Sequence, residues 1–142
     1  MKVLFGCDPN AAEMKNDLMK VAEKLGCEVV DMGSEDPIYA NTAIAVAEAV
    51  AAGKGDRGVL VCGTGLGMSI AANKVKGIRC AHCADALEAQ LCRQHNNANM
   101  MAIGAGFTGP KLAAAMVETF LSTAFEGGRH ARRVALMDAI EG

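Results

Sequence analysis

The chain has 142 residues, a formal net charge of −2 at pH 7 and 51% hydrophobic residues, with no Trp and only 4% aromatic residues. This length fits a single domain, 1–142, that buries a core of ordinary size. The weak negative charge and the absence of a Lys/Arg cluster argue against nucleic acid as the main partner. No apolar stretch is long enough for a signal peptide or a membrane span, so we expect a cytoplasmic protein whose six cysteines stay reduced.

Short apolar runs alternate with longer helical patterns along the whole chain. The runs that we predict to be strands are 2–7, 28–32, 58–62, 78–82 and 100–104. The helical patterns cover 11–25, 39–52, 66–74, 84–94, 110–124 and 131–140. This alternation is typical of repeated βαβ units. We therefore predict an α/β fold, doubly wound in three α/β/α layers, whose five-stranded parallel and Rossmann-like sheet has the strand order 2-1-3-4-5.

The predicted sheet indicates where a ligand would bind. In doubly wound sheets, ligands bind beyond the carboxyl ends of the strands, at the point where the strand order reverses. With the order 2-1-3-4-5 this point lies between the first and third strands, which end in Cys7-Asp8 and in Cys62-Gly63-Thr64. We therefore expect a carboxylate and a thiol to share one crevice.

The stretch after the third strand is rich in glycine. Gly63, Gly65 and Gly67 permit a tight turn, and the amides of Gly63, Thr64 and Gly65 lie at the start of the next predicted helix. Such amides favour an anion or oxyanion, and a thiol such as Cys62 beside a helix N-terminus is favoured as its thiolate. A purely structural cysteine followed by an ordinary turn fits the same spacing. The stretch is not a P-loop, because it lacks the Gly-Lys-Ser/Thr ending.

Two other patterns resemble known sites without fitting them. Gly104–Gly109 matches G-x-G-x-x-G after a strand, but no further strand follows with an acidic ribose ligand. Cys80 and Cys83, with Cys92 and His95, resemble two pairs of zinc ligands, yet the gap between the pairs is too short and the first pair lies on a predicted strand and its end. That first pair is also not placed between a strand and a helix as in thioredoxin. We expect no metal and no other cofactor.

Two polar clusters lie in the second half of the chain. His95 and Asn96 follow the end of a predicted helix, where a single histidine is more often a capping or surface residue than a catalyst. Arg129 and Arg133 follow a Gly-Gly turn at i, i+4 spacing and therefore share one face of the last helix. Guanidinium groups suit multidentate binding of phosphate, although a solvated amphipathic helix has the same pattern.

Four motifs together carry a resemblance to a known family. They are Gly6-Cys-Asp8, Cys62-G-T-G-x-G67, Arg93-Q-H-N-N and Gly127-G-R-H-x-x-Arg133. In order and spacing they resemble the ribose-5-phosphate isomerase B family, which includes the galactose-6-phosphate isomerase subunits, and the resemblance covers essentially the whole chain.

The resemblance implies a metal-free aldose–ketose isomerase of a sugar phosphate that works through a cis-enediolate. The first substrate it implies is ribose 5-phosphate with ribulose 5-phosphate, in the pentose phosphate pathway. In this family the site lies between two subunits. The resemblance therefore implies a homodimer or a dimer of dimers, with the C-terminal helix, about 129–141, packed on the partner.

The resemblance also implies roles for single residues. Cys62 is the base that moves a carbon-bound proton. Thr64, with the amides of its flanking glycines, stabilises the developing oxyanion. His95 opens the furanose ring. The remaining substrate-binding residues are Asp8, Tyr39, Gly63, Gly65, Gly67, Asn96, Arg129 and Arg133.

Three positions depart from the family's pattern. Pro9 stands where the family usually has a histidine after Gly-Cys-Asp. Ile38 replaces the histidine of a Tyr-Pro-His-Tyr segment, of which Tyr39 is kept, and Gly106 replaces an arginine that many members carry after the fifth strand. The phosphate side has therefore changed while the proton-transfer side is intact. We expect the same reaction, either on ribose 5-phosphate with weaker phosphate contacts or on a shifted substrate.

Other substrates and one other function stay open. The alternative substrates are allose phosphate, galactose or tagatose 6-phosphate, and a tetrose phosphate. The stretches beginning at Asp8 and Tyr39 lean towards the galactose-6-phosphate isomerase A subunit and towards tetrose-phosphate isomerases. A tetrose phosphate that does not cyclise would not need His95, so a ring-forming sugar fits better. The alternative from another class is a non-catalytic sugar-phosphate-binding subunit that needs a paralogous partner, and the retained Cys62 and His95 argue against it.

Overall fold

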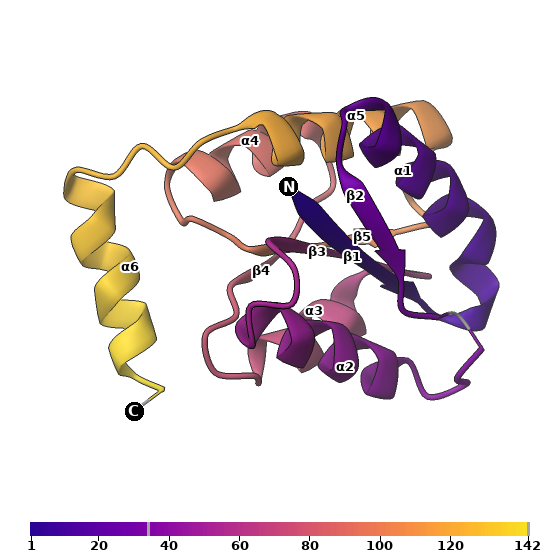
Figure 1. Cartoon of the computed structure of the whole chain (residues 1–142), viewed down its shortest axis with the longest axis horizontal. Coiled ribbons are helices and arrows are strands. Elements are labelled where there is room, and N and C mark those ends of the chain that lie inside the picture. The colour runs from indigo at the N-terminus through magenta and orange to yellow at the C-terminus, as the bar shows by residue number, and fades with distance from the viewer. Residues whose placement is uncertain (34, 142) are drawn as a thin grey trace.

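The computed structural model describes residues 1–33 and 35–141. A five-stranded parallel sheet forms the middle layer, with helices on both faces (Figure 1). The predicted α/β class and its three layers are confirmed. The strands are β1 (Lys2–Cys7), β2 (Glu28–Asp31), β3 (Arg57–Cys62), β4 (Cys80–His82) and β5 (Met100–Gly104).

The helices divide between the two faces of the sheet. They are the short 3-10 helix η1 (Pro9–Ala11), α1 (Ala12–Lys24), α2 (Tyr39–Ala51), α3 (Leu66–Asn73), α4 (Ala86–Gln94), α5 (Pro110–Ser122) and α6 (Arg129–Ala139). Helices α1, α4 and α5 cover one face, and α2 and α3 cover the other (Figure 1). All six predicted helices are confirmed, with ends that shift by up to two residues.

The predicted strand order is wrong at one edge. The observed order is β2-β1-β3-β5-β4, so β5 lies between β3 and β4. All five residues of β5 are buried, whereas the three residues of β4 change from buried to exposed along the strand. A short strand that ends in an exposed histidine suits an edge, and a fully apolar strand suits the interior. The reversal point between β1 and β3 is unaffected, and the loop after β5 now lies beside the end of β3.

The core consists of two apolar clusters, one on each face of the sheet. Side chains alternate between the faces along each strand, so Val59 and Val61 of β3 join the cluster under α1 and α5. Leu60 and Cys62 of the same strand join the cluster under α2 and α3. Cys62 is therefore 6% exposed and lies at the rim of the second cluster, where the strand ends.

Helix α6 is attached differently from the other helices. In Figure 1 it stands apart from the sheet, at the end of a long connection from α5. Arg79 Nη1 contacts Asp138 Oδ1 at 3.0 Å, and the amide of Gly77 donates to Glu141 Oε2 at 2.9 Å. Leu136 and Ile140 are 61% and 86% exposed. Within the described residues, no helix has both the length and the apolar character that a membrane span requires.

Candidate active site

The turn after β3 places a thiol at the start of a helix. The amide of Gly65 donates to Cys62 Sγ at 3.0 Å, and the amide of Leu66 donates to Thr64 Oγ1 at 3.2 Å. Gly65 is the N-cap of α3 and has a left-handed backbone, with φ of 79°. The sulfur therefore lies within the first turn of a helix N-terminus, and an N–H that points at it stabilises a thiolate.

Two glycines of the turn are required by close packing. A Cβ on Gly65 would lie 2.8 Å from His82 Cδ2 and 2.9 Å from the carbonyl carbon of Ile103. A Cβ on Gly67 would overlap the ring of Tyr39. A Cβ on Gly63, by contrast, meets nothing within 4 Å. In the spacing G-x-G-x-G, close packing therefore requires Gly65 and Gly67, whereas Gly63 leaves the space above the turn open.

Asp8 and Tyr39 complete a small hollow around Cys62. Its volume is about 270 Å³, and its lining residues are Asp8, Tyr39, Cys62, Gly63, Thr64 and Gly67. Asp8 caps η1 by accepting the amide of Asn10 at 2.8 Å, and its own amide donates to the carbonyl of Val61 at 3.1 Å. The predicted meeting of a carboxylate and a thiol between β1 and β3 is confirmed. None of these lining residues carries a positive charge.

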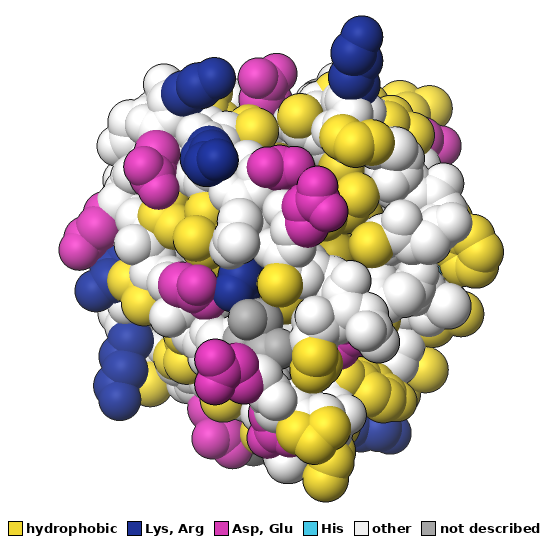
Figure 2. Space-filling model, turned by 90° about the vertical axis from the view of Figure 1, so that its right-hand side faces the viewer, with side chains coloured by type: hydrophobic (Ala, Val, Ile, Leu, Met, Phe, Trp, Pro, Cys, Tyr) yellow, Lys and Arg dark blue, Asp and Glu magenta, His cyan; other side chains and the backbone are white. Residues whose placement is uncertain are grey.

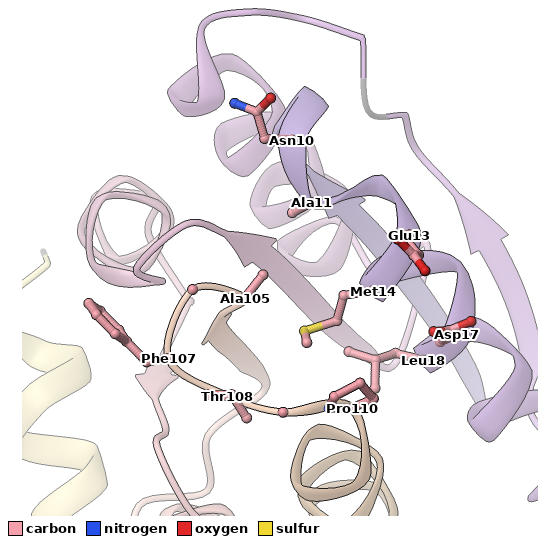
Figure 3. Close-up of a pocket in the computed structure, with 12 residues that line it drawn as sticks. Asn10, Ala11, Glu13, Met14, Asp17, Leu18, Ala105, Phe107, Thr108 and Pro110 are labelled. Atoms are coloured by element: carbon pink, nitrogen blue, oxygen red, sulfur yellow. The ribbon is translucent and has the colours of Figure 1, made fainter.

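A second hollow of about 470 Å³ lies between the start of α1 and the loop after β5. One of its lining residues, Gly106, donates its amide to the carbonyl of Gly63, which lines the first hollow, at 2.9 Å. Figure 3 shows Met14 pointing from α1 towards this loop, while Phe107 extends away from Met14 and Leu18. Phe107 is 77% exposed. The departure at Gly106 therefore lies next to the Cys62 turn.

The other predicted site residues lie elsewhere in the chain. His95 caps the end of α4, and Asn96 lines a hollow between β4 and α6. Arg129 and Arg133 are exposed on the first two turns of α6. Figure 2 shows the side of the molecule towards which β1 runs, where acidic side chains gather on the left half and no histidine is visible among the described residues. One chain therefore separates the predicted site into two groups.

Two residues at these groups were not singled out from the sequence. His82 Nε2 lies 2.9 Å from the carbonyl oxygen of Thr64, so it ties the end of β4 to the Cys62 turn. Glu126 Oε1 lies 3.8 Å from His95 Nε2 and 3.5 Å from His130 Nε2. The position of His82 at the end of a predicted strand was a usable signal, because strand ends share one edge of the sheet. No sequence signal pointed to Glu126, because it lies in a loop far from His95 in sequence.

Five of the six cysteines are buried, and Cys27 is partly exposed. Burial, with a smaller contribution from Cys92, raises the pKa of Cys80 to about 12. The hydrogen bond with Cys92, together with burial, raises the pKa of Cys83. The group of described residues whose ligand atoms come within 4.8 Å of one another is His95, Glu126 and His130, and it contains none of the cysteines. The four residues that resembled two zinc-ligand pairs do not converge.

Comparison with known proteins gives concordant matches over the whole chain. A family model described as Ribose/Galactose Isomerase matches residues 3–137. Ribose-5-phosphate isomerase B of Escherichia coli K12 is 45% identical over 99% of this chain and 96% of that protein. D-Erythrulose-4-phosphate isomerase of Pectobacterium atrosepticum is 41% identical over 94% and 91%. The structure of ribose-5-phosphate isomerase B from Clostridium thermocellum matches with a TM-score of 0.94 at 43% identity, over 99% and 97%.

Proposed function

The chain belongs to the ribose/galactose isomerase family, and on that premise we propose that it interconverts ribose 5-phosphate and ribulose 5-phosphate. It is an aldose–ketose isomerase of a sugar phosphate. The observation that carries the finer proposal is the Cys62 sulfur, which receives the Gly65 amide at 3.0 Å within a hollow lined by Asp8 and Tyr39. That geometry supports a thiolate base at the open end of a strand.

Cys62 acts on the open-chain sugar. Its thiolate takes the proton from C2 of the aldose, which leaves a cis-enediolate across C1 and C2, and returns a proton to C1 to form the ketose. Negative charge develops on the oxygens during this step. The Thr64 hydroxyl and the amide of Gly63 stabilise that charge at the helix N-terminus, and Asp8 holds sugar hydroxyls. This chemistry needs no metal.

A second copy of the chain supplies the phosphate and ring-opening groups. The Cys62 hollow has no cationic lining residue among those described, yet it must receive a phosphate ester. Arg129 and Arg133 lie in the first turns of α6, where the helix dipole disfavours cations, so a functional reason for them is needed. Helix α6 stands apart and exposes Leu136 and Ile140. These features support a homodimer in which α6, His95 and Asn96 of one copy complete the site of the other.

A tetrose phosphate is the second candidate substrate. It is favoured by the 41% identity to a protein named D-erythrulose-4-phosphate isomerase. Pro9 and Gly106 change the side of the site that adjoins the second hollow, consistent with a different sugar length. His95, which a sugar that cannot cyclise does not need, favours ribose 5-phosphate. A non-catalytic subunit is the weaker alternative, because the Cys62 turn is fully built.

The test is turnover by the purified full chain in EDTA, against ribose, allose, galactose and erythrose phosphates. Activity is expected with ribose 5-phosphate. Cys62→Ala should lower kcat by about a thousandfold while substrate still binds, because the base is lost and the binding groups remain. Cys27→Ala is the matched control, since Cys27 precedes the edge strand β2, whereas Cys62 ends the central strand β3. Undiminished turnover by Cys62→Ala would contradict the mechanism. A lack of activity with every sugar phosphate tested would favour the non-catalytic subunit that needs a paralogous partner.

A further inference from the structure

Three ionisable side chains from separate segments meet beside the end of α4. His95 caps α4, Glu126 lies in the connection between α5 and α6, and His130 lies in the first turn of α6. Glu126 Oε1 lies 3.8 Å from His95 Nε2 and 3.5 Å from His130 Nε2. The two imidazole rings stack, with centroids 4.4 Å apart and planes 12° from parallel.

The backbone around this cluster is fixed on both sides. The amide of Glu126 donates to the carbonyl of Gln94 at 3.1 Å, which ties the α5–α6 connection to the last turn of α4. Arg93 is 3% exposed, and its Nε donates to the carbonyl of Thr123 at 3.1 Å. Its Nη1 donates to the carbonyl of Ala98 at 2.7 Å. The backbone of Glu126 is therefore fixed beside the end of α4, which places its half-exposed carboxylate next to His95.

We propose that Glu126 is a positioning residue for His95 in the opening of the sugar ring. This inference rests on the proposed function, because it requires His95 to act on a furanose. A carboxylate at ion-pair distance from one imidazole nitrogen favours a proton on that nitrogen and one rotation of the ring. Here Glu126 Oε1 lies 3.8 Å from Nε2, so Nδ1 is left for the sugar.

The step balances with these groups. The C1–O4 bond breaks, its electron pair goes to O4, and O4 takes a proton from the His95 imidazolium to become the 4-hydroxyl. The C1 hydroxyl loses its proton to solvent water and becomes the aldehyde carbonyl. His95 is then neutral and regains a proton from solvent. Glu126 keeps its own charge throughout and gives the imidazolium a charged partner.

His130 supports this arrangement as a neutral neighbour. Burial lowers the pKa of His130, and the adjacent His95 and Arg129 lower it further, against the opposing effect of Glu126. A neutral ring stacks on His95 without adding a second positive charge. The stack and the carboxylate therefore both favour the observed orientation of the His95 ring.

A metal site is the competing use of the same three residues. Two histidines and a glutamate are a ligand set that suits zinc, and their ligand atoms lie within 4.8 Å of one another. Imidazole lone pairs, however, lie in the ring planes, and these planes are only 12° from parallel. The lone pairs of the two rings therefore run side by side, whereas zinc at about 2.0–2.1 Å from each nitrogen requires them to converge. The geometry favours the positioning role.

Glu126→Gln in the full chain separates ring opening from proton transfer. Turnover of ribose 5-phosphate starts from the furanose. Ribulose 5-phosphate is open-chain because its 5-hydroxyl is esterified, so exchange of its C1 proton in D₂O, followed by NMR, requires only the base. We expect kcat for ribose 5-phosphate to fall about 10- to 100-fold, with C1 exchange within about threefold of wild type. Glu126→Asp should recover part of the loss, and Glu118→Gln, an exposed charge change on α5, should change neither rate.

Controls distinguish the failure of this inference from the failure of the proposed function. Cys62→Ala should lose both rates, and His95→Ala only turnover from the furanose. If His95→Ala turns over ribose 5-phosphate normally, the role of His95 is wrong and the inference falls with it. If His95→Ala is impaired and Glu126→Gln is not, the inference alone is overturned. Stoichiometric zinc in the purified protein that Glu126→Gln loses would also overturn it, because the cluster would then be a metal site.

A second readout does not depend on turnover. Nitrogen-15 shifts of the His95 imidazole, recorded at a pH at which the ring is neutral, identify which nitrogen carries the remaining proton in the free protein. We expect a proton on Nε2 in the wild type and a mixture of tautomers in Glu126→Gln. Identical shifts in the two proteins would overturn the inference whatever substrate the enzyme uses.

Discussion

The Cys62 turn and the segment from Glu126 to Arg133 differ in what holds them. The turn depends on its backbone geometry, with a left-handed Gly65 packed against the end of β5 and Gly67 packed against the Tyr39 ring. The C-terminal segment is joined to the end of α4 by one backbone bond of Glu126 and by side-chain contacts with His95, and α6 stands apart from the sheet (Figure 1). The proposed proton-transfer residues thus lie together within one chain. The part with the arginines faces outward, as expected if it serves another copy.

The largest effect should come from breaking the backbone of the turn. Gly65→Ala would place a β carbon at φ of 79° and within 3.0 Å of the backbone of Ile103 and Gly104. We expect the free energy of unfolding to fall by about 3 kcal/mol, because left-handed strain and overpacking add. Turnover should fall more than about a hundredfold, because the Gly65 amide loses its place at the Cys62 sulfur. Denaturant unfolding and steady-state kinetics measure the two effects.

Gly63→Ala is the matched control for stability. Gly63 belongs to the same turn, but its φ is not positive and a Cβ there meets nothing within 4 Å. Its unfolding free energy should stay within about 0.5 kcal/mol of wild type. Equal losses of stability in Gly63→Ala and Gly65→Ala would show that the turn is not held by its backbone geometry.

The arginines of α6 should show the opposite pattern, a loss of binding without a loss of stability. Arg129→Ala or Arg133→Ala should raise KM about 10- to 100-fold, because each removes a charge-assisted contact worth about 1.5–3 kcal/mol. The thermal midpoint should not fall, since both side chains are exposed at a helix start that disfavours cations. Arg132→Ala, which removes an exposed arginine of the same helix that has no proposed role in the site, is the control. A KM unchanged by both variants would remove these arginines from the site.

Most of the fold was predictable because its signals are local. Apolar runs and helical patterns predicted the five strands and six α-helices of the described residues, with β1 and β5 placed at their observed bounds, but not the short η1. The strand order was not predictable in this way. It depends on which of the last two strands occupies the interior of the sheet. In hindsight, the composition of residues 78–82, with Arg79 and His82, carried the signal: a strand with two polar residues belongs at an edge.

The part of the site around Cys62 was predictable, because a residue pattern with a known chemical use falls at the reversal point of the sheet. The glycine spacing after Cys62 and the reversal point between β1 and β3 predicted the meeting of Asp8 with Cys62, which the structure confirms. The contact of Glu126 with His95 joins residues 31 positions apart through a loop, and no periodic pattern encodes it. Long-range contacts between irregular segments are set by the packed fold. A single sequence does not display them.

The smallest effect should come from loosening α6 itself. The contact between Arg79 and Asp138, at 3.0 Å, joins α6 to the residue that precedes β4. Because Asp138 is 43% exposed, Asp138→Asn should lower the unfolding free energy by less than about 1 kcal/mol. Amide exchange should nevertheless become faster in α6 and stay unchanged in α3, since only α6 depends on this pair.

Arg79→Met should act more strongly, because it also removes the bond from Arg79 Nε to the carbonyl of Asn97. Exchange that quickens equally in both helices would mean that α6 is part of the same cooperative unit as the Cys62 turn, and the contrast between the two regions would fail.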